Sequence, residues 1–433
     1  MRRESCDIAI IGAGAAGLAA AVFAGARARK PDARIILIES ARRPGAKILV
    51  SGGGRCNVTN DVVTADDFWG GSRHTIAKVL QAFSNEDTVA WFHRMGVPLK
   101  LESTGKYFPT SDQAQTVLSA LLAQVAPAGV DLTSGERVTD VRLDGDGFLV
   151  QCKSIAGQTS MCRARRVIVA TGGLSLPKSG SDGAGLSIMQ RLGHTIIPTT
   201  PALTPLVLRS GASVGGRFSE FRGITMDARL RLCRGRRTQP IIELTGSLVF
   251  THFGVSGPVA MNLSRHWLRA RMADRHTSLR VVFGVPRLAT IEQADQWLLK
   301  QARAHPRRSV ETALSELLPD RIAQAIVAEF NEQSTLSQLP SQTRRQLALQ
   351  LVELELDVVD TRGYSHAEAT AGGVDLREIE WRTMESRKMR GLHLCGEILD
   401  VDGRIGGFNF QWAWSTGFLA GRGAAEALGR QLA

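Results

Sequence analysis

The chain has 433 residues, 43% of them apolar and 22% charged, which is long enough for two or three domains and too apolar for a disordered protein. Its 53 Lys and Arg residues exceed its 41 Asp and Glu residues, giving a formal net charge of +12. Six scattered cysteines without a CxxC pair exclude a disulfide scaffold and a cysteine-rich zinc site, so we expect reduced thiols, no metal site and a cytoplasmic protein.

The uncharged run from Ile8 to Ala26 imitates a signal peptide or a membrane span, but 13 of its 19 residues are Gly or Ala. Such a run is only weakly hydrophobic, and its glycine spacing fits a nucleotide-binding turn better. We find no other stretch of about 20 apolar residues. We therefore expect a soluble protein without a membrane partner.

The first elements in chain order predict a βαβ unit. Cys6–Ile11 reads as a buried strand, Ala15–Ala28 as an Ala-rich helix, and Arg34–Ile38 as a second strand. A Gly-rich loop is expected over Pro44–Asn60. The pattern then predicts helices at 74–82, 85–95 and 111–126, a hairpin of 135–143 and 147–152, and a buried strand at 166–170.

From residue 196 the composition changes to Pro, Thr and short β-like runs, and helical periodicity returns near residue 290. A short apolar strand at 391–395 and a Gly/Ala-rich helix at 407–428 close the chain. We therefore predict an α/β nucleotide-binding domain formed by residues 1–195 and 361–433. The insert between them comprises residues 196–360, with a β-rich part at 196–286 and a helical part at 287–352.

Gly12-x-Gly14-x-x-Gly17 follows a predicted strand and opens a predicted helix. Gly12 permits the tight turn, Gly14 lets a pyrophosphate approach the backbone, and Gly17 lets helix and strand pack closely. The helix N-terminus then holds the phosphates. Glu39 ends the second strand 22 residues after Gly17, where a carboxylate can accept the ribose hydroxyls. The pattern predicts dinucleotide binding.

Three other segments favour FAD over NAD. Ile168–Gly173 resembles the Ala-Thr-Gly turn of flavoproteins with two dinucleotide-binding domains. The hairpin at 136–152 resembles their small sheet, where the Val138 backbone meets the adenine. Gly391–Asp400 resembles the late strand that presents an acid to the ribityl chain. The helix after Gly406-Gly407 then points its N-terminus at the flavin pyrimidine, or else it is a purely structural closing helix.

Lys47–Asn60 reads KILVSGGGRCNVTN and resembles the signature loop of the bacterial BaiN/RdsA-type flavoproteins, also called the aminoacetone oxidase-like or YhiN-like family. The resemblance covers nearly the whole chain. The sequence departs from the family at Lys106, where Arg is expected, and at Ala369, where Val is expected; neither departure touches FAD binding. Further matching stretches are Gly105–Pro109, Phe250–Pro258, Ala369–Val374 and Glu397–Gly403.

The resemblance implies a Rossmann-like FAD-binding domain of the two-dinucleotide-binding-domain type, interrupted by a β-barrel-like insert with a helical subdomain. Ser51–Asn57 can form a nest of backbone N–H groups for phosphate or flavin, or a plain turn cluster. The residues expected to bind FAD are Gly12, Ala13, Gly14, Ala16, Gly17, Glu39, Ser40, Lys47, Ser51, Gly52, Gly53, Arg55, Asn57, Val138, Thr171, Gly172, Gly173, Gly396, Glu397, Asp400, Gly407, Phe408 and Asn409.

Cys56 and His252 are the candidate catalytic residues. If the family layout holds, Cys56 lies near the flavin, and its thiol can donate a proton to a substrate carbon; a buried, inert cysteine is the alternative. His252 lies in a Gly/Ser/Pro-rich loop and can act as an acid or base, or it can serve a structural hydrogen-bonding role.

The positive charge is concentrated in one stretch. Residues 201–310 hold 18 basic residues against six acids, whereas the rest of the chain holds 35 of each. A basic insert in a neutral protein suggests an anionic partner such as ribosomal RNA, and a merely solvated surface is the alternative. The densest part contains Arg231, Arg234, Arg236 and Arg237.

No second dinucleotide fingerprint occurs, because Gly183-x-Gly185 and Gly403–Gly407 lack the strand–turn–helix pattern. NAD(P)H therefore docks transiently, or the substrate itself reduces the flavin. The resemblance implies an FAD-dependent oxidoreductase that reduces an activated C=C bond with NAD(P)H, with uridine in ribosomal RNA as one substrate class. Oxidation of a small amino ketone by oxygen, and an RNA-binding or redox-sensing flavoprotein of low turnover, are the alternatives.

Overall fold

The computed structural model describes residues 3–28, 33–211, 213–234, 239–330 and 335–429. The chain divides into two compact units, which we describe separately. Unit 1 comprises Met1–Pro201 and Glu368–Ala433, and unit 2 comprises Ala202–Ala367. The first boundary lies six residues later than the sequence pattern placed it, because β11 (Ile196–Ala202) pairs with β19 (Ala369–Val374), a strand of unit 1.

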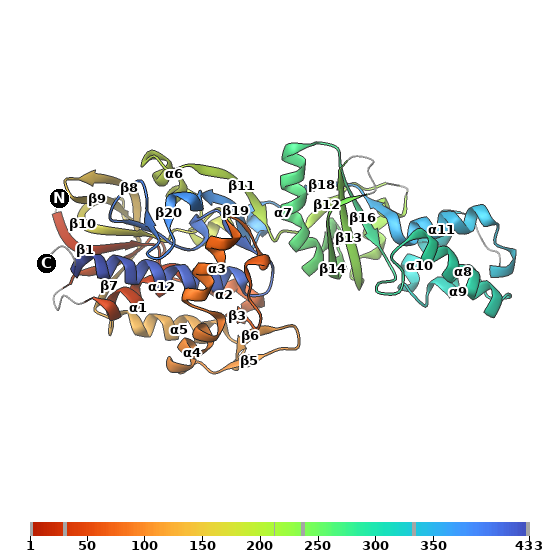
Figure 1. Ribbon diagram of the computed structural model, residues 1–433, viewed down its shortest axis with the longest axis horizontal. Helices are drawn as coiled ribbons and strands as arrows, with labels where there is room; N and C mark the ends of the chain where they lie inside the picture. Colours follow the sequence, from red (N-terminus) through yellow and green to blue (C-terminus); the bar gives the residue numbers. More distant parts are fainter. Residues whose placement is uncertain (1–2, 29–32, 212, 235–238, 331–334, 430–433) are drawn as a thin grey trace. The chain divides into compact units, whose positions relative to one another are not determined.

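A nine-stranded mixed sheet forms the centre of unit 1 (Figure 1). β1 pairs in parallel with a strand on each side, so Ile8 to Ile11 form a continuous buried run rather than an alternating one. This confirms the predicted βαβ start. The parallel strands are, in spatial order, β22 (Leu392–Leu394), β10 (Thr159–Val169), β1 (Arg3–Ile11), β2 (Ile35–Glu39) and β7 (Val130–Ser134).

The long strand β10 carries two partners along its other edge. Its first half pairs antiparallel with β9, which forms the predicted hairpin with β8, and its last three residues pair with β22. At the end of β22, a short antiparallel pair, β20 and β21, completes the sheet. These elements are β8 (Glu136–Asp144), β9 (Gly147–Ser154), β20 (Ile379–Glu380) and β21 (Glu385–Ser386).

The first and last helices, α1 (Ala15–Arg27) and α12 (Phe408–Gly429), lie side by side and run parallel (Figure 1). A Cβ added at Gly417 would lie 2.6 Å from the carbonyl oxygen of Ala16, and one added at Gly421 would lie 2.4 Å from that of Ala20. Only glycine allows this approach, because any side chain at these two positions meets the backbone of α1.

Short helices and a small sheet surround this core. The predicted loop at 44–60 is wrong in part, because it contains α2 (Ala46–Val50), a segment without Gly or Pro whose Ile48 is buried. Ser84 caps α4 in a reciprocal pair with Asp87. The elements are α3 (Arg73–Ala82), α4 (Asn85–Arg94), α5 (Ala114–Val125), α6 (Ala184–Arg191), β3 (Thr59–Asn60), β4 (Phe68–Gly70), β5 (Leu99–Leu101), β6 (Lys106–Pro109) and β23 (Val401–Gly403).

Unit 2 contains a seven-stranded antiparallel sheet that curls on itself. β17 and β18 stand at opposite ends of the strand order, yet Asp357 alone separates them in the chain. The two sheet edges are therefore continuous through one extended segment, which is the predicted barrel-like form. In chain order the strands are β12 (Leu206–Leu208), β13 (Thr225–Arg234), β14 (Pro240–Phe250), β15 (Gly254–Ser256), β16 (Thr277–Val282), β17 (Leu354–Leu356) and β18 (Val358–Thr361).

Five helices complete unit 2 within the described residues. α7 (Pro258–Ala273) packs on β14, where Val259 lies 3.5 Å from the Cβ position of Gly246. Four further helices form the predicted helical part, and an Arg344–Asp295 ion pair of 2.7 Å joins two of them. These four are α8 (Ile291–Ala304), α9 (Val310–Leu314), α10 (Asp320–Ala328) and α11 (Ser341–Glu353).

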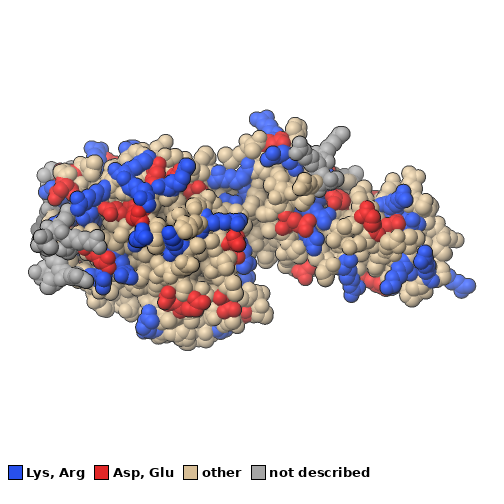
Figure 2. Space-filling model, viewed as in Figure 1, with Lys and Arg blue, Asp and Glu red and all other residues tan. Residues whose placement is uncertain are grey.

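In the folded protein, acidic residues from outside residues 201–310 neutralise part of the positive charge of that stretch. The segment around β17 and β18 brings acidic residues next to these arginines. Glu353 forms ion pairs with Arg231 at 2.9 Å and with Arg280 at 2.7 Å, and Asp357 forms an ion pair with Arg209 at 2.7 Å. Unit 2 has 22 basic and 15 acidic residues, a net charge of +7, and unit 1 has 31 and 26, a net charge of +5. Figure 2 shows carboxylates among the cations on the face that it draws.

We expect Gly421→Ala to destabilise the protein by about 1–3 kcal/mol, because its Cβ must displace the α1 backbone. Thermal unfolding followed by circular dichroism measures the effect. Gly211→Ala is the control, since a Cβ there meets nothing within 4 Å and the φ of Gly211 is not positive. Equal melting temperatures for Gly421→Ala and wild type would contradict the close helix contact.

Candidate FAD site

The turn from β1 into α1 contains the three predicted glycines, and each meets a different environment. A Cβ at Gly12, whose φ is +100°, would lie 2.6 Å from the carbonyl oxygen of Ala170. A Cβ at Gly17 would lie 1.8 Å from the carbonyl oxygen of Gly12. A Cβ at Gly14 meets nothing within 4 Å. Gly12 and Gly17 therefore close the turn, while Gly14 borders open space at the start of α1.

Glu39 ends β2 beside that turn, and its side chain is buried. One carboxylate oxygen accepts a hydrogen bond from the backbone N–H of Ala13 at 2.7 Å. The other accepts from the N–H of Ala41 at 2.8 Å and from the hydroxyl of Ser40 at 3.1 Å. These bonds fix the acid beside the Gly-rich turn, and the oxygen that accepts from Ala13 retains capacity for a further bond.

Residues 51–54 form a tight turn after α2 in which consecutive glycines adopt left-handed backbone conformations. The φ angle is +56° at Gly52, +69° at Gly53 and +86° at Gly54. Ser51 anchors the turn by donating to the carbonyl of Ile48 at 2.8 Å. Side chains other than glycine are disfavoured at such φ values. The turn thus exposes backbone rather than side chains, as an anion-binding nest requires.

Arg55, the cation expected beside phosphate or flavin, is engaged within the protein. Its guanidinium donates to Glu102 at 2.7 Å, lies 3.5 Å from Asp112 and stacks on Phe108 at 3.9 Å. The hydrogen bond to Glu102 raises the pKa of Arg55. The side chain joins the signature loop to the β5–β6 segment, and its contact with a cofactor stays a prediction.

The end of the signature loop packs against the start of α12. A Cβ at Gly407 would lie 2.9 Å from the Oδ1 atom of Asn57 and 2.7 Å from the carbonyl carbon of Thr59. The indole N–H of Trp414 donates to the carbonyl of Val58 at 2.9 Å. Two segments that the sequence identified separately are therefore in contact in unit 1.

Phe408 and Asn409, also expected at the cofactor, have partners within the protein. Phe408 is fully buried and packs edge-to-face on Phe68 with ring centroids 6.0 Å apart. The side chain of Asn409 accepts from the N–H of Gly403 at 2.8 Å and donates to the carbonyl of Gly403 at 3.0 Å. Both residues fix the start of α12, so any FAD contact from them involves the backbone.

A polar cluster links Lys47 of the signature loop to Glu397 of the late strand segment. The ammonium of Lys47 lies 2.6 Å from the Glu397 carboxylate, 2.7 Å from the Ser175 hydroxyl and 3.0 Å from the Ser181 hydroxyl. Ser175 also donates to Glu397 at 2.6 Å. We call Lys47, Ser175, Ser181 and Glu397 the lysine cluster. The sequence identified the two charged members of the cluster but missed both serines, because they lie outside the recognised motifs.

The turn after β10 completes this region. The φ angle of Gly172 is +73°, and a Cβ there would lie 2.5 Å from the hydroxyl of Ser181. A Cβ at Gly173 would lie 2.5 Å from the hydroxyl of Thr370, which accepts from the N–H of Ser175 at 3.0 Å. Thr370 is thus a further positioning residue; it lies in the family-matching stretch Ala369–Val374 but was not among the expected site residues.

The remaining predicted residues lie in the same unit. Val138 is buried in β8 beside a register shift that leaves its neighbour Thr139 unpaired. Gly396 has a φ of +79°, and a Cβ there would lie 2.7 Å from the Cβ of Ala16. Asp400 is buried, and its carbonyl accepts from the N–H of Gly71 at 2.8 Å.

Cys56 is fully buried at 0% exposure and has a left-handed φ of +62°. Burial raises the pKa of its thiol to about 12, so the sulfur stays protonated at neutral pH. The thiol is therefore in the protonated form that proton donation requires. Cys395 is equally buried, and burial raises the pKa of its thiol as well. Catalysis by Cys56 stays a prediction.

His252 belongs to unit 2, in the turn between β14 and β15. Its ring is exposed and packs edge-to-face on Phe253 at 5.1 Å, without a hydrogen bond to any described residue. The structural hydrogen-bonding alternative therefore has no support among the described residues. A catalytic role for His252 also stays a prediction.

Three observations in unit 1 fit a dinucleotide such as FAD. The open space at Gly14 adjoins the N-terminus of α1, whose first turn has no acidic residue and no side-chain cap. The Oδ1 atom of Asn57 and the hydroxyl of Thr171 are buried without a hydrogen-bond partner among the described residues. Finally, Gly417 faces Ala16, the second residue of α1, and α12 begins nine residues before Gly417, so its N-terminus extends about 12 Å beyond the start of α1.

Membrane-spanning helices and metal-binding clusters are not found in the described part of the chain. Every helix there is too short or too polar to cross a membrane. No group of three or more His, Cys, Asp or Glu side chains among those residues is arranged to hold a metal ion.

The family model described as "HI0933-like protein Rossmann domain" matches residues 6–423. The chain belongs to this HI0933-like family. It is an FAD-dependent oxidoreductase with a Rossmann-type domain, as the signature loop and the Gly-rich turn indicate.

The relatives that match over nearly the whole chain include enzymes with two different named activities. The 3-dehydro-bile acid delta(4,6)-reductase of Clostridium scindens is 34% identical and aligns with 97% of this chain and 99% of its own. The ribosomal RNA dihydrouridine synthase of Escherichia coli is 31% identical and aligns with 95% of this chain and 96% of its own.

A solved structure of Escherichia coli quinol fumarate reductase has a TM-score of 0.53 and 17% identity to this HI0933-like protein, over 100% of this chain and 72% of that one. At that identity the likeness shows the fold alone.

Gly14→Val and Gly17→Val should separate binding from folding. We expect Gly14→Val to fold and lose flavin, because its side chain enters the open space where pyrophosphate approaches. Gly17→Val should fail to fold, because its Cβ meets the Gly12 carbonyl. Flavin absorbance and melting temperature after gel filtration report the two effects. Full flavin retention in Gly14→Val would contradict pyrophosphate binding at the Gly-rich turn.

Lys47→Met should weaken FAD binding about tenfold or more, because the Glu397 carboxylate loses its cation. The double variant Lys47→Met/Glu397→Gln should recover part of that loss, since no uncompensated charge remains. Titration of flavin-free protein with FAD measures both affinities. If wild type and Lys47→Met bind FAD with the same affinity, the lysine cluster is not part of the FAD site.

Proposed function

We propose that this chain uses electrons from NAD(P)H to reduce a C=C bond conjugated to a carbonyl, and that the substrate is uridine in ribosomal RNA. The observation that carries the proposal is the pair of full-length relatives, 34% and 31% identical to this chain. Their names describe different substrates but one kind of reaction, the saturation of a C=C bond.

The two substrates share the electronic feature that makes such reduction feasible. A 3-dehydro bile acid unsaturated at positions 4 and 6 and a uracil ring both hold a C=C bond in conjugation with a carbonyl. The carbon distant from the carbonyl accepts hydride, since the carbonyl oxygen delocalises the resulting charge, and the adjacent carbon takes a proton. Bound FAD supplies the hydride chemistry in such a reaction.

The chain's own residues then have to hold the cofactor and deliver a proton. Glu39 and the lysine cluster hold fixed charges and hydrogen bonds beside the Gly-rich turn and the signature loop. The N-terminus of α12 supports negative charge on a reduced flavin ring. Cys56, which stays protonated at neutral pH, and the exposed His252 are the proton donors to be tested.

Electrostatics favour RNA over a small neutral substrate, because unit 2 carries a net charge of +7. The dense arginine stretch contributes less unpaired positive charge for RNA binding than the sequence suggests. Arg231 is only 13% exposed in its ion pairs with Glu243 and Glu353, and Arg236 and Arg237 lie outside the described residues. Cations of unit 2 that are exposed and form no ion pair with a described residue are Arg222, Arg234, Arg271, Arg275, Arg287, Lys300, Arg303, Arg307, Arg321 and Arg345.

NAD(P)H is proposed to bind transiently, because the sequence has one dinucleotide fingerprint. Oxidation of a small amino ketone by oxygen is the competing chemistry. The two differ in the direction of electron flow, since the reductase takes electrons from NAD(P)H and the oxidase takes them from its substrate.

Anaerobic mixing of the flavin-loaded protein with NADPH or NADH should bleach the flavin band, and addition of ribosomal RNA lacking the modification should restore it. The RNA should gain two mass units per modified uridine, measured by mass spectrometry of its nucleosides. Cys56→Ala should keep its flavin and slow only the second step. Bleaching by an amino ketone, with no response to NADPH or NADH, would establish the oxidase instead.

A further inference from the structure

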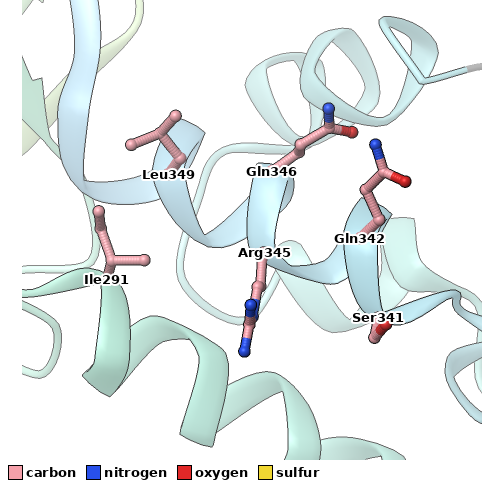
Figure 3. Close-up of a pocket in the computed structure, with 6 residues that line it drawn as sticks. All are labelled: Ile291, Ser341, Gln342, Arg345, Gln346 and Leu349. Carbon is pink, nitrogen blue, oxygen red and sulfur yellow. The ribbon is translucent and has the colours of Figure 1, made fainter.

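A groove of about 400 Å³ lies in unit 2 between the start of α8 and the exposed side of α11. The groove is largely open to solvent. Its lining on α11 spans nine residues, or about 12 Å along the helix axis. The groove is lined by Ile291 of α8 and by Ser341, Gln342, Arg345, Gln346 and Leu349 of α11 (Figure 3).

The polar side chains that line this α8–α11 groove lack partners. Gln342, Arg345 and Gln346 are exposed and form no hydrogen bond or ion pair with any described residue. The neighbouring Arg344, by contrast, is bound to Asp295 at 2.7 Å. Figure 3 shows Gln342 and Gln346 extending together from α11, one turn apart. Two amides and a guanidinium are thus available to a ligand along one helix.

The apolar residues of the groove are aliphatic. Leu349 is 45% exposed, and Ile291 is half-buried. A peptide helix docks through several apolar anchors at helical spacing, whereas the exposed part of α11 offers Leu349 alone. Aliphatic walls can cover the face of a base, but the groove has no aromatic ring for stacking. Hydrogen bonds from the amides therefore have to supply most of the recognition.

The charges around the groove indicate where a phosphate can lie. Asp295 is neutralised by Arg344, so it does not repel an anion. Glu292 follows Ile291 and is exposed, which disfavours a phosphate at the start of α8. Arg345 on α11 carries the available positive charge. A phosphate contact is expected at Arg345, and base contacts are expected at Gln342 and Gln346.

We propose that the α8–α11 groove binds a single-stranded segment of the RNA substrate, with Gln342 and Gln346 on base edges and Arg345 on the backbone. This inference rests on the proposed function. It assigns the RNA a specific contact surface in unit 2, in addition to the general attraction by the positive charge of that unit. A length of about 12 Å accommodates about three stacked nucleotides, at about 3.4 Å each. The groove is thereby a specificity-determining surface rather than a general basic patch.

The test measures filter binding of a ribosomal RNA fragment to the full flavin-loaded protein at several salt concentrations. Gln342→Ala/Gln346→Ala should raise the dissociation constant about tenfold and leave the salt slope unchanged, because amides release no counterions. Arg345→Ala should flatten the slope by about 0.7, as expected for one lost phosphate contact. All of these side chains are exposed, so melting temperature and flavin content should equal those of wild type.

Gln296→Ala/Lys300→Ala is the matched control. Both residues are exposed on α8, and they lie five and nine residues after Ile291, about 140° and 180° around the helix from the groove. The control should bind RNA like wild type. Loss of binding in the control equal to that in the groove variants would show general electrostatics and overturn the proposal, as would wild-type affinity in the groove variants.

Filter binding, taken together with the mass spectrometry of the RNA nucleosides, separates this proposal from the proposed function. Wild-type protein that binds no RNA and reduces no uridine overturns the RNA substrate, and the groove proposal with it. Wild-type protein that binds RNA and reduces uridine, together with groove variants that behave identically, overturns the groove alone.

Discussion

The close approach of α1 and α12 is the contact on which unit 1 depends. Gly417 and Gly421 place α12 against the backbone of α1, so the two ends of the chain form one domain. Because the helices run parallel, their positive N-terminal ends face the same direction. The Gly-rich turn before α1 and the contact of Gly407 with the signature loop are thereby fixed with respect to one another.

The lysine cluster is a polar site that the fold of unit 1 holds together. Lys47, Ser175, Ser181 and Glu397 come from three segments, and their short hydrogen bonds satisfy a cation and an anion that are both partly buried. A charge at such depth is costly unless it is paired and hydrogen-bonded. By contrast, the Oδ1 atom of Asn57 and the hydroxyl of Thr171 are buried and have no hydrogen-bond partner among the residues that the structure describes; a bound dinucleotide can provide one.

Unit 2 illustrates why charge counted along a sequence differs from charge on a surface. The barrel recruits Glu353 and Asp357 from outside the basic stretch, and these acids neutralise arginines that the sequence counts as free. Specific recognition then depends less on total charge than on side chains that are left unpaired. Gln342 and Arg345 of α11 are of that kind, whereas Arg231 is not.

The sequence by itself determined the local elements and the dinucleotide fold, because glycine spacing, buried apolar runs and the Glu39 position are local properties of the chain. It also identified both charged members of the lysine cluster through the signature loop and the late strand. It did not identify Ser175, Ser181 or Thr370, since a serine or threonine acquires its role only from what folds against it. Tertiary structure alone decided that Arg55 pairs with Glu102 and that α2 forms within a predicted loop, because ion pairing and burial join residues that are distant in the chain.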